Sequence, residues 1–446
     1  MLGDIVYLNA LGIDILVVET VEKAVDLLEK RANNYSDRPA LAVLDLTTSS
    51  EWNFSLIPYG LKWRKLRRTF HESYSPAVIE QYRPVMKEEV QRCLSKVKDN
   101  PDAALEPLRM FWGTLAMRTS YGFVDPERNE SLAKYAERFS EGFGEAIKPA
   151  NFLVNIFPSL RYVPDWFPGT GWKRHLKELA THCLALRFRW CAARLTNLQQ
   201  DRRYRSMAAT IVDNLPEEND PMRAEAESLG RDAAVMAYLG GADTTASATT
   251  ALVLALAMNY DVQKKAHAEL DAIIGIERLP EIEDLPTLPY VHAIVKEVNR
   301  WFTVLPMGVG HSSVEDDEYE GYFIPKGALV MPNAWAMMHN PDTFENPFEF
   351  KPERYLKDGQ IDPTVPDAEQ AAFGFGRRIC PGRHFSHDAL FLLAASLMHT
   401  FLVEPPKDDS GNIRPLALRI SNHFVCKPLP FKCVVTLRPG REALVL

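Results

Sequence analysis

The chain has 446 residues, of which 46% are hydrophobic and 25% charged, a composition typical of a globular protein with a large core. Its formal net charge of −8, with no long basic run, argues against nucleic acid as a partner. The six cysteines form no CxxC pair, which argues against a disulfide framework or a zinc site and fits a reducing compartment.

The N-terminal segment predicts two short strands followed by a helix. Residues 5–8 and 13–18 are strand-like runs separated by Gly12, which indicates a tight turn. The period becomes helical over 21–31, and amphipathic helical segments then dominate to about residue 300. The first residues show neither a basic nor a sustained apolar region, so they do not resemble a signal peptide.

Two side chains in a basic segment share one helical face. Trp63 and Arg67 are four residues apart within the sequence WRKLRR. Residues at this spacing lie on the same side of a helix. By itself the segment is also compatible with an ordinary basic amphipathic helix.

Paired glycines interrupt a long apolar helical segment at 240–241. Each costs a helix roughly 1 kcal/mol relative to alanine, so a reason for them is expected. They remove bulk where a small ligand could sit, and Thr244 offers a hydroxyl there with Asp243 as a nearby carboxylate. Such groups can deliver protons. The charge-free run 244–260 is shorter than the roughly 20 residues of a spanning helix, so we expect a buried helix.

Beyond residue 296 the chain offers an ion pair and then a loop-rich region. Glu297 and Arg300 share a helical face and can pair. Strand-like runs follow at 322–324, 328–331 and 433–437, and a histidine, His311, lies in a loop before them. A second arginine, Arg354, lies in the sequence KPERY.

The segment 373–382, FGFGRRICPG, places Cys380 behind a glycine loop and just before Pro381. Proline is favoured at the first position of a helix, and a helix-compatible apolar run follows at 388–402. We therefore expect Cys380 at the positive end of a helix. Unpaired N–H groups there lower a cysteine pKa and favour a thiolate metal ligand.

The glycines of this segment, Gly376 and Gly382 among them, let the backbone turn sharply and approach a flat cofactor. Arg378 is placed to pair with a carboxylate of that cofactor. The complete pattern FxxGxRxCxG resembles the signature of the cytochrome P-450 family. This resemblance covers nearly the whole chain. It implies a mainly α fold with a smaller β portion (α+β), forming a single catalytic domain over residues 1–446.

The resemblance implies specific roles around a haem b, iron-protoporphyrin IX. Cys380 becomes the thiolate ligand of the iron, Phe373 packs near the sulfur, and Arg378 contacts a propionate. A thiolate ligand favours O–O cleavage and hence oxygen activation. Gly376 and Gly382 complete the cofactor loop.

Other segments resemble further motifs of the family. The [AG]GxDT motif implies Thr244 as the hydroxyl on the oxygen side and Asp243 as its acidic partner. The WxxxR pair implies that Trp63 and Arg67 contact a propionate.

His311 stands where relatives carry a basic propionate contact, although its flanking residues depart from the commoner pattern. The segment around Tyr355 is similar to the PERF motif, which implies a buried structural triad of Glu297, Arg300 and Arg354.

The resemblance implies a haem-thiolate monooxygenase that inserts one oxygen atom from O₂ into a small apolar organic molecule. The segments 60–63, 315–319 and 380–384 resemble fungal members, which suggests secondary metabolism or xenobiotic oxidation. The chain shows no NADPH or flavin fingerprint, so we expect electrons from NADPH through a separate, acidic flavoprotein reductase.

Two alternatives remain open. One is a haem-thiolate isomerase or peroxygenase that needs no reductase, and the other is a non-catalytic haem-binding product of a truncated chain.

The resemblance also bears on location. Microsomal relatives begin with a membrane anchor, whereas this sequence begins in what resembles the first sheet strand, so we expect the anchor and first helix to be lacking. The cytosolic side of the endoplasmic reticulum is implied by the resemblance. A cytosolic protein is the alternative, with membrane association left open.

Overall fold

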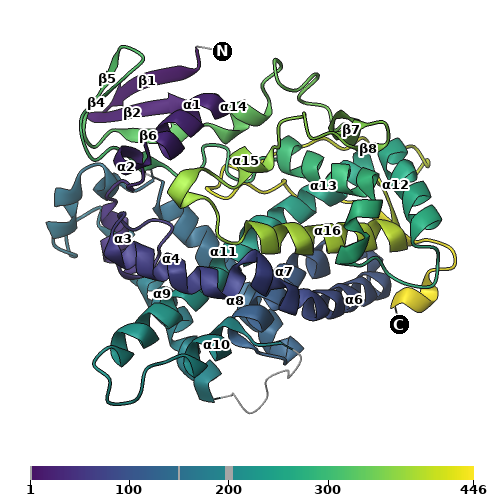
Figure 1. The fold of residues 1–446 in the computed structure, drawn as a ribbon, viewed down its shortest axis with the longest axis horizontal. Helices are drawn as coiled ribbons and strands as arrows, with labels where there is room; N and C mark the ends of the chain where they lie inside the picture. Colours follow the sequence, from purple (N-terminus) through teal and green to yellow (C-terminus); the bar gives the residue numbers. More distant parts are fainter. Residues whose placement is uncertain (1–2, 149–150, 196–203, 446) are drawn as a thin grey trace.

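The computed structural model describes residues 3–148, 151–195 and 204–445. Helices make up most of the molecule, and the strands β1, β2, β4, β5 and β6 gather at one corner near the N-terminus (Figure 1). The predicted fold class, mainly α with a smaller β portion, is confirmed. The α-helices are α1 (Val21–Val25), α2 (Ala32–Tyr35), α3 (Ala42–Leu46), α4 (Leu61–Tyr74), α5 (Pro76–Ile79), α6 (Arg83–Asp99), α7 (Leu105–Tyr121), α8 (Pro126–Ala146), α9 (Gly171–Leu195), α10 (Met207–Asp213), α11 (Arg223–Met258), α12 (Tyr260–Ile273), α13 (Pro289–Trp301), α14 (Ala334–Met338), α15 (Glu369–Ala372) and α16 (Arg383–Thr400). The strands are β1 (Ile5–Ala10), β2 (Ile13–Val18), β3 (His311–Ser312), β4 (Asp317–Tyr319), β5 (Tyr322–Ile324), β6 (Leu329–Pro332), β7 (Leu356–Lys357), β8 (Gln360–Ile361), β9 (Phe401–Glu404) and β10 (Val434–Leu437).

The largest sheet joins the N-terminal strands to strands of the 311–332 segment, in the order β1-β2-β6-β3. The predicted N-terminal hairpin is confirmed: β1 and β2 pair antiparallel, and Gly12 has a positive φ in the turn. β2 then pairs parallel with β6, and β3 pairs antiparallel with β6. This pairing fixes His311 on β3 opposite Val330 on β6.

The helix predicted at 21–31 is present, but it consists of a short α-helix followed by a π-helix. α1 begins after Thr20, whose hydroxyl accepts a hydrogen bond from the amide of Lys23. It continues as a π-helix, η1 (Asp26–Lys30). Figure 1 shows this segment lying between the sheet and the helical part of the molecule. It packs against the 3₁₀ turn η10 (Gly376–Arg378) that precedes Cys380.

The helix predicted at 388–402 has different limits. α16 begins at Arg383 with Gly382 as its N-cap, so Pro381 does not occupy the first helical position. Both predicted ends of this helix are therefore corrected, because the residues on either side belong to other elements. Residues 380–382 form the turn out of η10, and Phe401 already belongs to β9, which pairs with β10.

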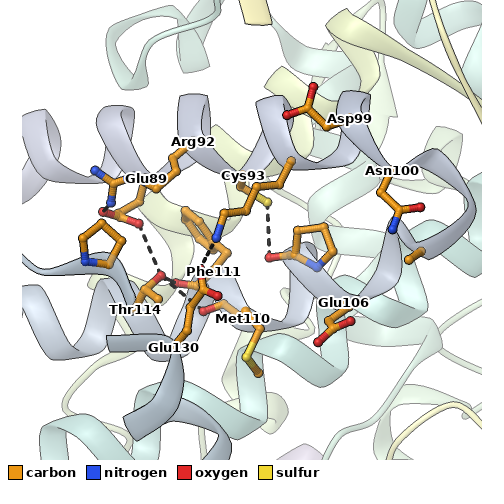
Figure 2. A pocket seen from close by; sticks show the side chains of 14 residues that line it. Glu89, Arg92, Cys93, Asp99, Asn100, Glu106, Met110, Phe111, Thr114 and Glu130 are labelled. Carbon is orange, nitrogen blue, oxygen red and sulfur yellow. Dashed lines mark hydrogen bonds and ion pairs between the residues drawn. The ribbon is translucent and has the colours of Figure 1, made fainter. Parts of the chain in front are cut away.

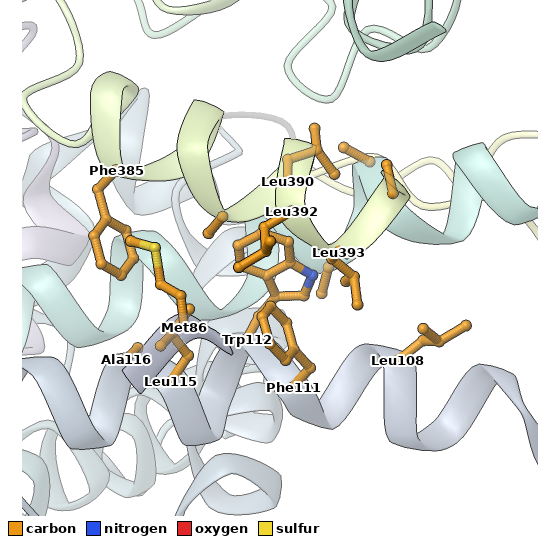
Figure 3. Close-up of a cluster of buried hydrophobic side chains, with 14 of the residues drawn as sticks. Met86, Leu108, Phe111, Trp112, Leu115, Ala116, Phe385, Leu390, Leu392 and Leu393 are labelled. Atoms are coloured by element: carbon orange, nitrogen blue, oxygen red, sulfur yellow. The ribbon is translucent and has the colours of Figure 1, made fainter. Parts of the chain in front are cut away.

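The long helix α11 passes through the centre of the molecule and contacts α4, α7, α8, α13 and α16. Trp112 of α7 donates a hydrogen bond from Nε1 to Thr249 Oγ1 of α11 at 2.8 Å, within the core. Figure 3 shows aromatic and aliphatic side chains of α7, such as Phe111 and Leu115, facing Phe385 and Leu393 of α16. None of the helices in the described ranges is both long and apolar enough to cross a bilayer.

Candidate active site

A cavity of about 390 Å³ lies where α4, α8, α11 and the loop before α16 meet. It brings together most of the residues that the sequence motifs single out. The predicted residues in its lining are Trp63, Arg67, Asp243, Thr244, His311, Phe373, Arg378, Cys380 and Gly382. Gly376, Glu297, Arg300 and Arg354 are outside the lining.

Cys380 is held by the backbone on both sides. Its amide donates to the carbonyl of Phe373 at 2.7 Å, and Arg383 Nη1 donates to the Cys380 carbonyl at 3.3 Å. Cys380 lines the cavity and is half-buried, and desolvation raises the pKa of its thiol. The N–H groups of Gly382 and Arg383 and the charge of Arg67 act in the opposite direction.

The predicted lowering of the Cys380 pKa is therefore wrong for the polypeptide alone. Desolvation of a thiolate outweighs the N–H groups at the start of α16. A coordinating metal ion deprotonates a thiol outright, so the pKa of the free thiol does not prevent ligation.

The glycines of the cysteine loop have two different structural roles. At Gly376, φ is +55° and a Cβ would lie 2.2 Å from the backbone oxygen of Leu28, so glycine is required for the loop to pack on η1. The Gly376 amide also donates to Glu29 Oε1 at 3.1 Å. At Gly374 and Gly382 a Cβ would meet nothing within 4 Å, and both border the cavity. These two positions leave open space beside the thiol.

Three arginines line the cavity without an ion pair in the described part of the chain: Arg38, Arg67 and Arg378. Arg378 is predicted to pair with a cofactor carboxylate, and here it donates to the carbonyls of Ser36, Phe54 and Ile57 at 2.8, 3.1 and 2.8 Å. Burial lowers the pKa of Arg378 to about 10, and it also lowers the pKa of Arg67.

Arg38 is a cavity residue that the sequence motifs do not predict, because no local pattern marks it. Its guanidinium donates to the carbonyls of Ser55, Val309 and Gly310 at 2.9, 2.6 and 2.8 Å. Buried cations are normally paired with anions, since an isolated buried charge is costly. This end of the cavity is therefore suited to an anionic group.

His311 and Trp63 lie at the same end. His311 is 4% exposed, and its Nδ1 is 2.8 Å from the carbonyl of Tyr35, so that nitrogen carries the proton. Burial lowers the pKa of His311 well below its ordinary value. The ring of Trp63 stacks on the guanidinium of Arg378, with 4.7 Å between the guanidinium carbon and the ring centroid.

On α11 the two predicted polar residues have partners of different kinds. Thr244 Oγ1 donates to the Gly240 carbonyl at 2.7 Å, one turn earlier in the helix, which leaves its lone pairs available as acceptors. Asp243 Oδ1 is 2.9 Å from Nζ of Lys427, a residue that no sequence motif marks. A Cβ at Gly240 would meet nothing within 4 Å, so the helix face beside Thr244 is open.

The other end of the cavity is apolar. We call it the apolar chamber, and it is formed by Phe139, Phe143, Ile147, Met236, Leu239, Val304, Leu305, Phe424 and Val425. Its elements meet directly, because a Cβ at Gly144 of α8 would lie 3.5 Å from Phe424 and Cys426 N donates to the Val304 carbonyl at 2.9 Å. Such a lining favours a ligand with little polar surface.

Glu297, Arg300 and Arg354 form a buried cluster outside the cavity. Arg300 binds both carboxylate oxygens of Glu297 at 2.8 Å, and Arg354 Nε lies 3.1 Å from each. The remaining donors of Arg300 reach carbonyls of the 338–349 segment. Since both Glu297 and Arg300 are 0% exposed, the cluster joins α13 to the loops around it, and its structural role stays a prediction.

A second cavity, of about 320 Å³, lies between α6, α7 and the start of α8 (Figure 2). Four of its charged side chains form two pairs: Glu89 accepts from Arg92, and Lys96 pairs with Glu130. Cys93 Sγ faces the carbonyl of Pro107 at 3.4 Å. We therefore interpret this cavity as a gap between packed helices that hydrogen bonds and ion pairs bridge, and not as a ligand site.

Comparison with known proteins agrees with this geometry. The Cytochrome P450 family model matches residues 1–435. The chain belongs to the cytochrome P450 family. Cytochrome P450 monooxygenase COX1 of Coprinopsis cinerea is 45% identical over 100% of this chain and 86% of its own length. Cytochrome P450 monooxygenase COX2 of the same fungus is 39% identical over 98% and 83%. Tryptamine 4-monooxygenase of Psilocybe cyanescens is 35% identical over 96% and 85%.

The cytochrome P450 relatives are monooxygenases, so this chain is an oxidoreductase of that class. Haem is the cofactor of the family, and the cavity fits it on three counts. Cys380 lines the space, glycines border it without side chains, and three arginines with no carboxylate partner among the described residues line it, where a propionate would pair with them.

Proposed function

We propose that this P450 is a haem-thiolate monooxygenase of fungal secondary metabolism or xenobiotic oxidation, formed by one catalytic domain over residues 1–446. It would insert one oxygen atom from O₂ into a small, mostly apolar organic molecule. The observation that carries the proposal is the joint lining of one cavity by Cys380, by three arginines without ion pairs and by the apolar chamber.

Haem b would be held between α11 and the cysteine loop. Cys380 supplies the thiolate ligand, and Phe373 and Gly382 border the sulfur side. Arg38, Arg67, Arg378, His311 and Trp63 hold the propionates, and a carboxylate beside His311 would raise its pKa and favour the protonated ring. When bound, the haem supplies the centre at which O₂ is activated.

The chain itself supplies positioning and protons. The apolar chamber orients the substrate by excluding water and fitting its hydrocarbon surface. The lone pairs of Thr244 Oγ1 can hold a water molecule at the open helix face beside Gly240. Asp243, the next residue, lines the same cavity and is the acidic group proposed to pass protons to that water. O₂ cleavage that yields water consumes protons, so a hydroxyl at this point has a direct use.

Electrons would come from NADPH through a separate, acidic flavoprotein reductase. Arg64 and Arg68 of α4 are exposed, and Arg377 is exposed beside the cysteine loop. A local cluster of cations steers an acidic partner even when the net charge of the chain is negative. A place at the cytosolic side of the endoplasmic reticulum, which the family resemblance implies, forms part of the same proposal.

The carbon monoxide difference spectrum of the reduced protein tests the ligand. A red-shifted Soret band typical of thiolate ligation supports the proposal, and its absence from haem-loaded protein contradicts it. Turnover with reductase and NADPH then separates a monooxygenase from an isomerase or peroxygenase, which works without reductase, and from a non-catalytic haem protein, which gives no product by either route.

A further inference from the structure

Lys427 connects three carboxylates at the edge of the cavity. Its Nζ lies 2.9 Å from Asp243 Oδ1 on α11 and 3.0 Å from Glu141 Oε1 on α8, with Glu137 of α8 at 3.8 Å. The side chain is 21% exposed and that of Asp243 is 10% exposed, so the pair is largely shielded from solvent. Glu141, by contrast, is about half exposed and lies on the solvent side of the lysine.

The segment that carries Lys427 is fixed on both sides. Cys426 N donates to the Val304 carbonyl at 2.9 Å, and Ser247 of α11 donates to the Cys426 carbonyl. The amide of Lys427 donates to Ser421 Oγ at 2.9 Å. The ion pair with Asp243 is therefore pre-organised, because the backbone on each side is already held in place.

Asp243 is the one carboxylate among the described residues that line the cavity. It lies on α11 one turn beyond Leu239 of the apolar chamber, and Lys427 is two residues after Val425 of the same chamber. An organic cation entering the chamber needs an anionic partner to replace its lost hydration. Asp243, the one carboxylate that lines the cavity among the described residues, is already paired with Lys427.

We propose that Lys427 determines the charge class of the substrate: by neutralising Asp243 it restricts the apolar chamber to uncharged molecules and excludes organic cations. This inference rests on the proposed function, in which the chamber holds the substrate. Lys427 would then determine specificity in two ways: its ammonium group repels an organic cation, and its ion pair with Asp243 removes the anion that such a cation needs. Burial alone would lower the pKa of Lys427, yet Asp243 and Glu141 raise it, so the ammonium group stays charged.

Two probes of equal shape test this, phenyltrimethylammonium and tert-butylbenzene, which differ by one positive charge. Neither has a lone pair that could bind iron. Equilibrium dialysis against the haem-loaded protein gives both affinities without any turnover. Lys427→Met should bind phenyltrimethylammonium about tenfold more tightly than the wild type, because Asp243 becomes free to pair with it. Its affinity for tert-butylbenzene should change by no more than about twofold.

Matched variants show which group binds the cation. Lys427→Arg should keep the selectivity of the wild type, and Lys427→Met combined with Asp243→Asn should lose the gain. If Lys427→Met does not retain haem, Lys427→Gln replaces it, because the amide can still hydrogen-bond to both carboxylates. An unchanged cation affinity in the haem-loaded variant overturns the proposal, and so does a gain that persists in the double variant.

The carbon monoxide spectrum of each preparation separates the two levels of inference. A thiolate-type spectrum combined with no gain in cation affinity would contradict the role of Lys427 alone. A wild-type protein without that spectrum would contradict the proposed function, whatever the dialysis shows.

Discussion

A Cβ atom at Gly376 would lie 2.2 Å from the carbonyl oxygen of Leu28, so the cysteine loop and the π-helix η1 are in backbone contact. The Gly376 φ of +55° adds a second requirement for glycine. This contact makes the N-terminal segment part of the support for Cys380, although the two are far apart in the sequence.

Gly376→Ala should therefore destabilise the protein by about 3 kcal/mol, since the clash is with backbone and the conformation is strained. Thermal unfolding and haem retention measure the effect. Gly359→Ala is the matched control, because its φ is +75° and a Cβ there would meet nothing within 4 Å. Equal losses in the two variants would show that the contact with Leu28 does not matter.

Cys380→Ser should abolish the thiolate-type carbon monoxide spectrum and leave little haem bound. A serine hydroxyl stays protonated and is a poor ligand for iron. Cys433→Ser, at a half-buried free cysteine before β10, should keep the wild-type spectrum. An unaltered Soret band in Cys380→Ser would disprove the ligand assignment.

Thr244→Ala should retain haem and substrate binding while diverting electrons to peroxide. The loss of the hydroxyl removes the water site proposed for proton delivery. The measured quantities are NADPH consumed, product and hydrogen peroxide. Thr250→Ala is a close control, because Thr250 makes the same kind of bond to a carbonyl of α11, at 2.9 Å, and does not line the cavity. Tight coupling in Thr244→Ala would refute the role of this hydroxyl.

Glu297→Gln should cost about 3 kcal/mol of folding free energy, because it leaves two arginine side chains facing a neutral group inside the protein. Urea unfolding of the haem-loaded protein measures this. Glu106→Gln removes a carboxylate from an exposed pair with Lys134 and should cost no more than about 0.5 kcal/mol. Comparable costs would mean that the Glu297 cluster contributes no more than a surface pair.

Reversal of Arg64 and Arg68 to glutamate should slow reduction by the reductase about tenfold at low salt and weaken its dependence on ionic strength. Lys65 is less suitable for this test, since its charge is already paired with Glu225 of α11. Stopped-flow reduction measures the effect, and peroxide-driven turnover should be unchanged.

The matched control for this reversal is Lys326→Glu with Lys357→Glu, which makes the same charge change at two exposed lysines, one between β5 and β6 and one in β7. Equal slowing by both double variants would point to a general charge effect and would place the docking surface elsewhere.

The sequence by itself determined the elements whose signals are local. The alternation of residues 5–18 and Gly12 predicted the N-terminal hairpin. Helical periodicity predicted that helices dominate the chain up to the end of α13. The segment FGFGRRICPG was enough to single out Cys380, because turn-forming glycines and a cysteine at fixed spacing act within ten residues. The limits of α16 were less predictable, since pairing between β9 and β10 ends that helix.

Only the tertiary structure decided which charges meet. Arg38 and Lys427 carry no local signal, yet one is buried beside Arg378 and the other neutralises Asp243, because segments hundreds of residues apart in the sequence pack together. The pKa of Cys380 likewise depends on burial by distant elements, which overrides the nearby helix start. Periodicity and spacing report how neighbours along the chain are arranged, whereas desolvation and ion pairing depend on the full three-dimensional packing.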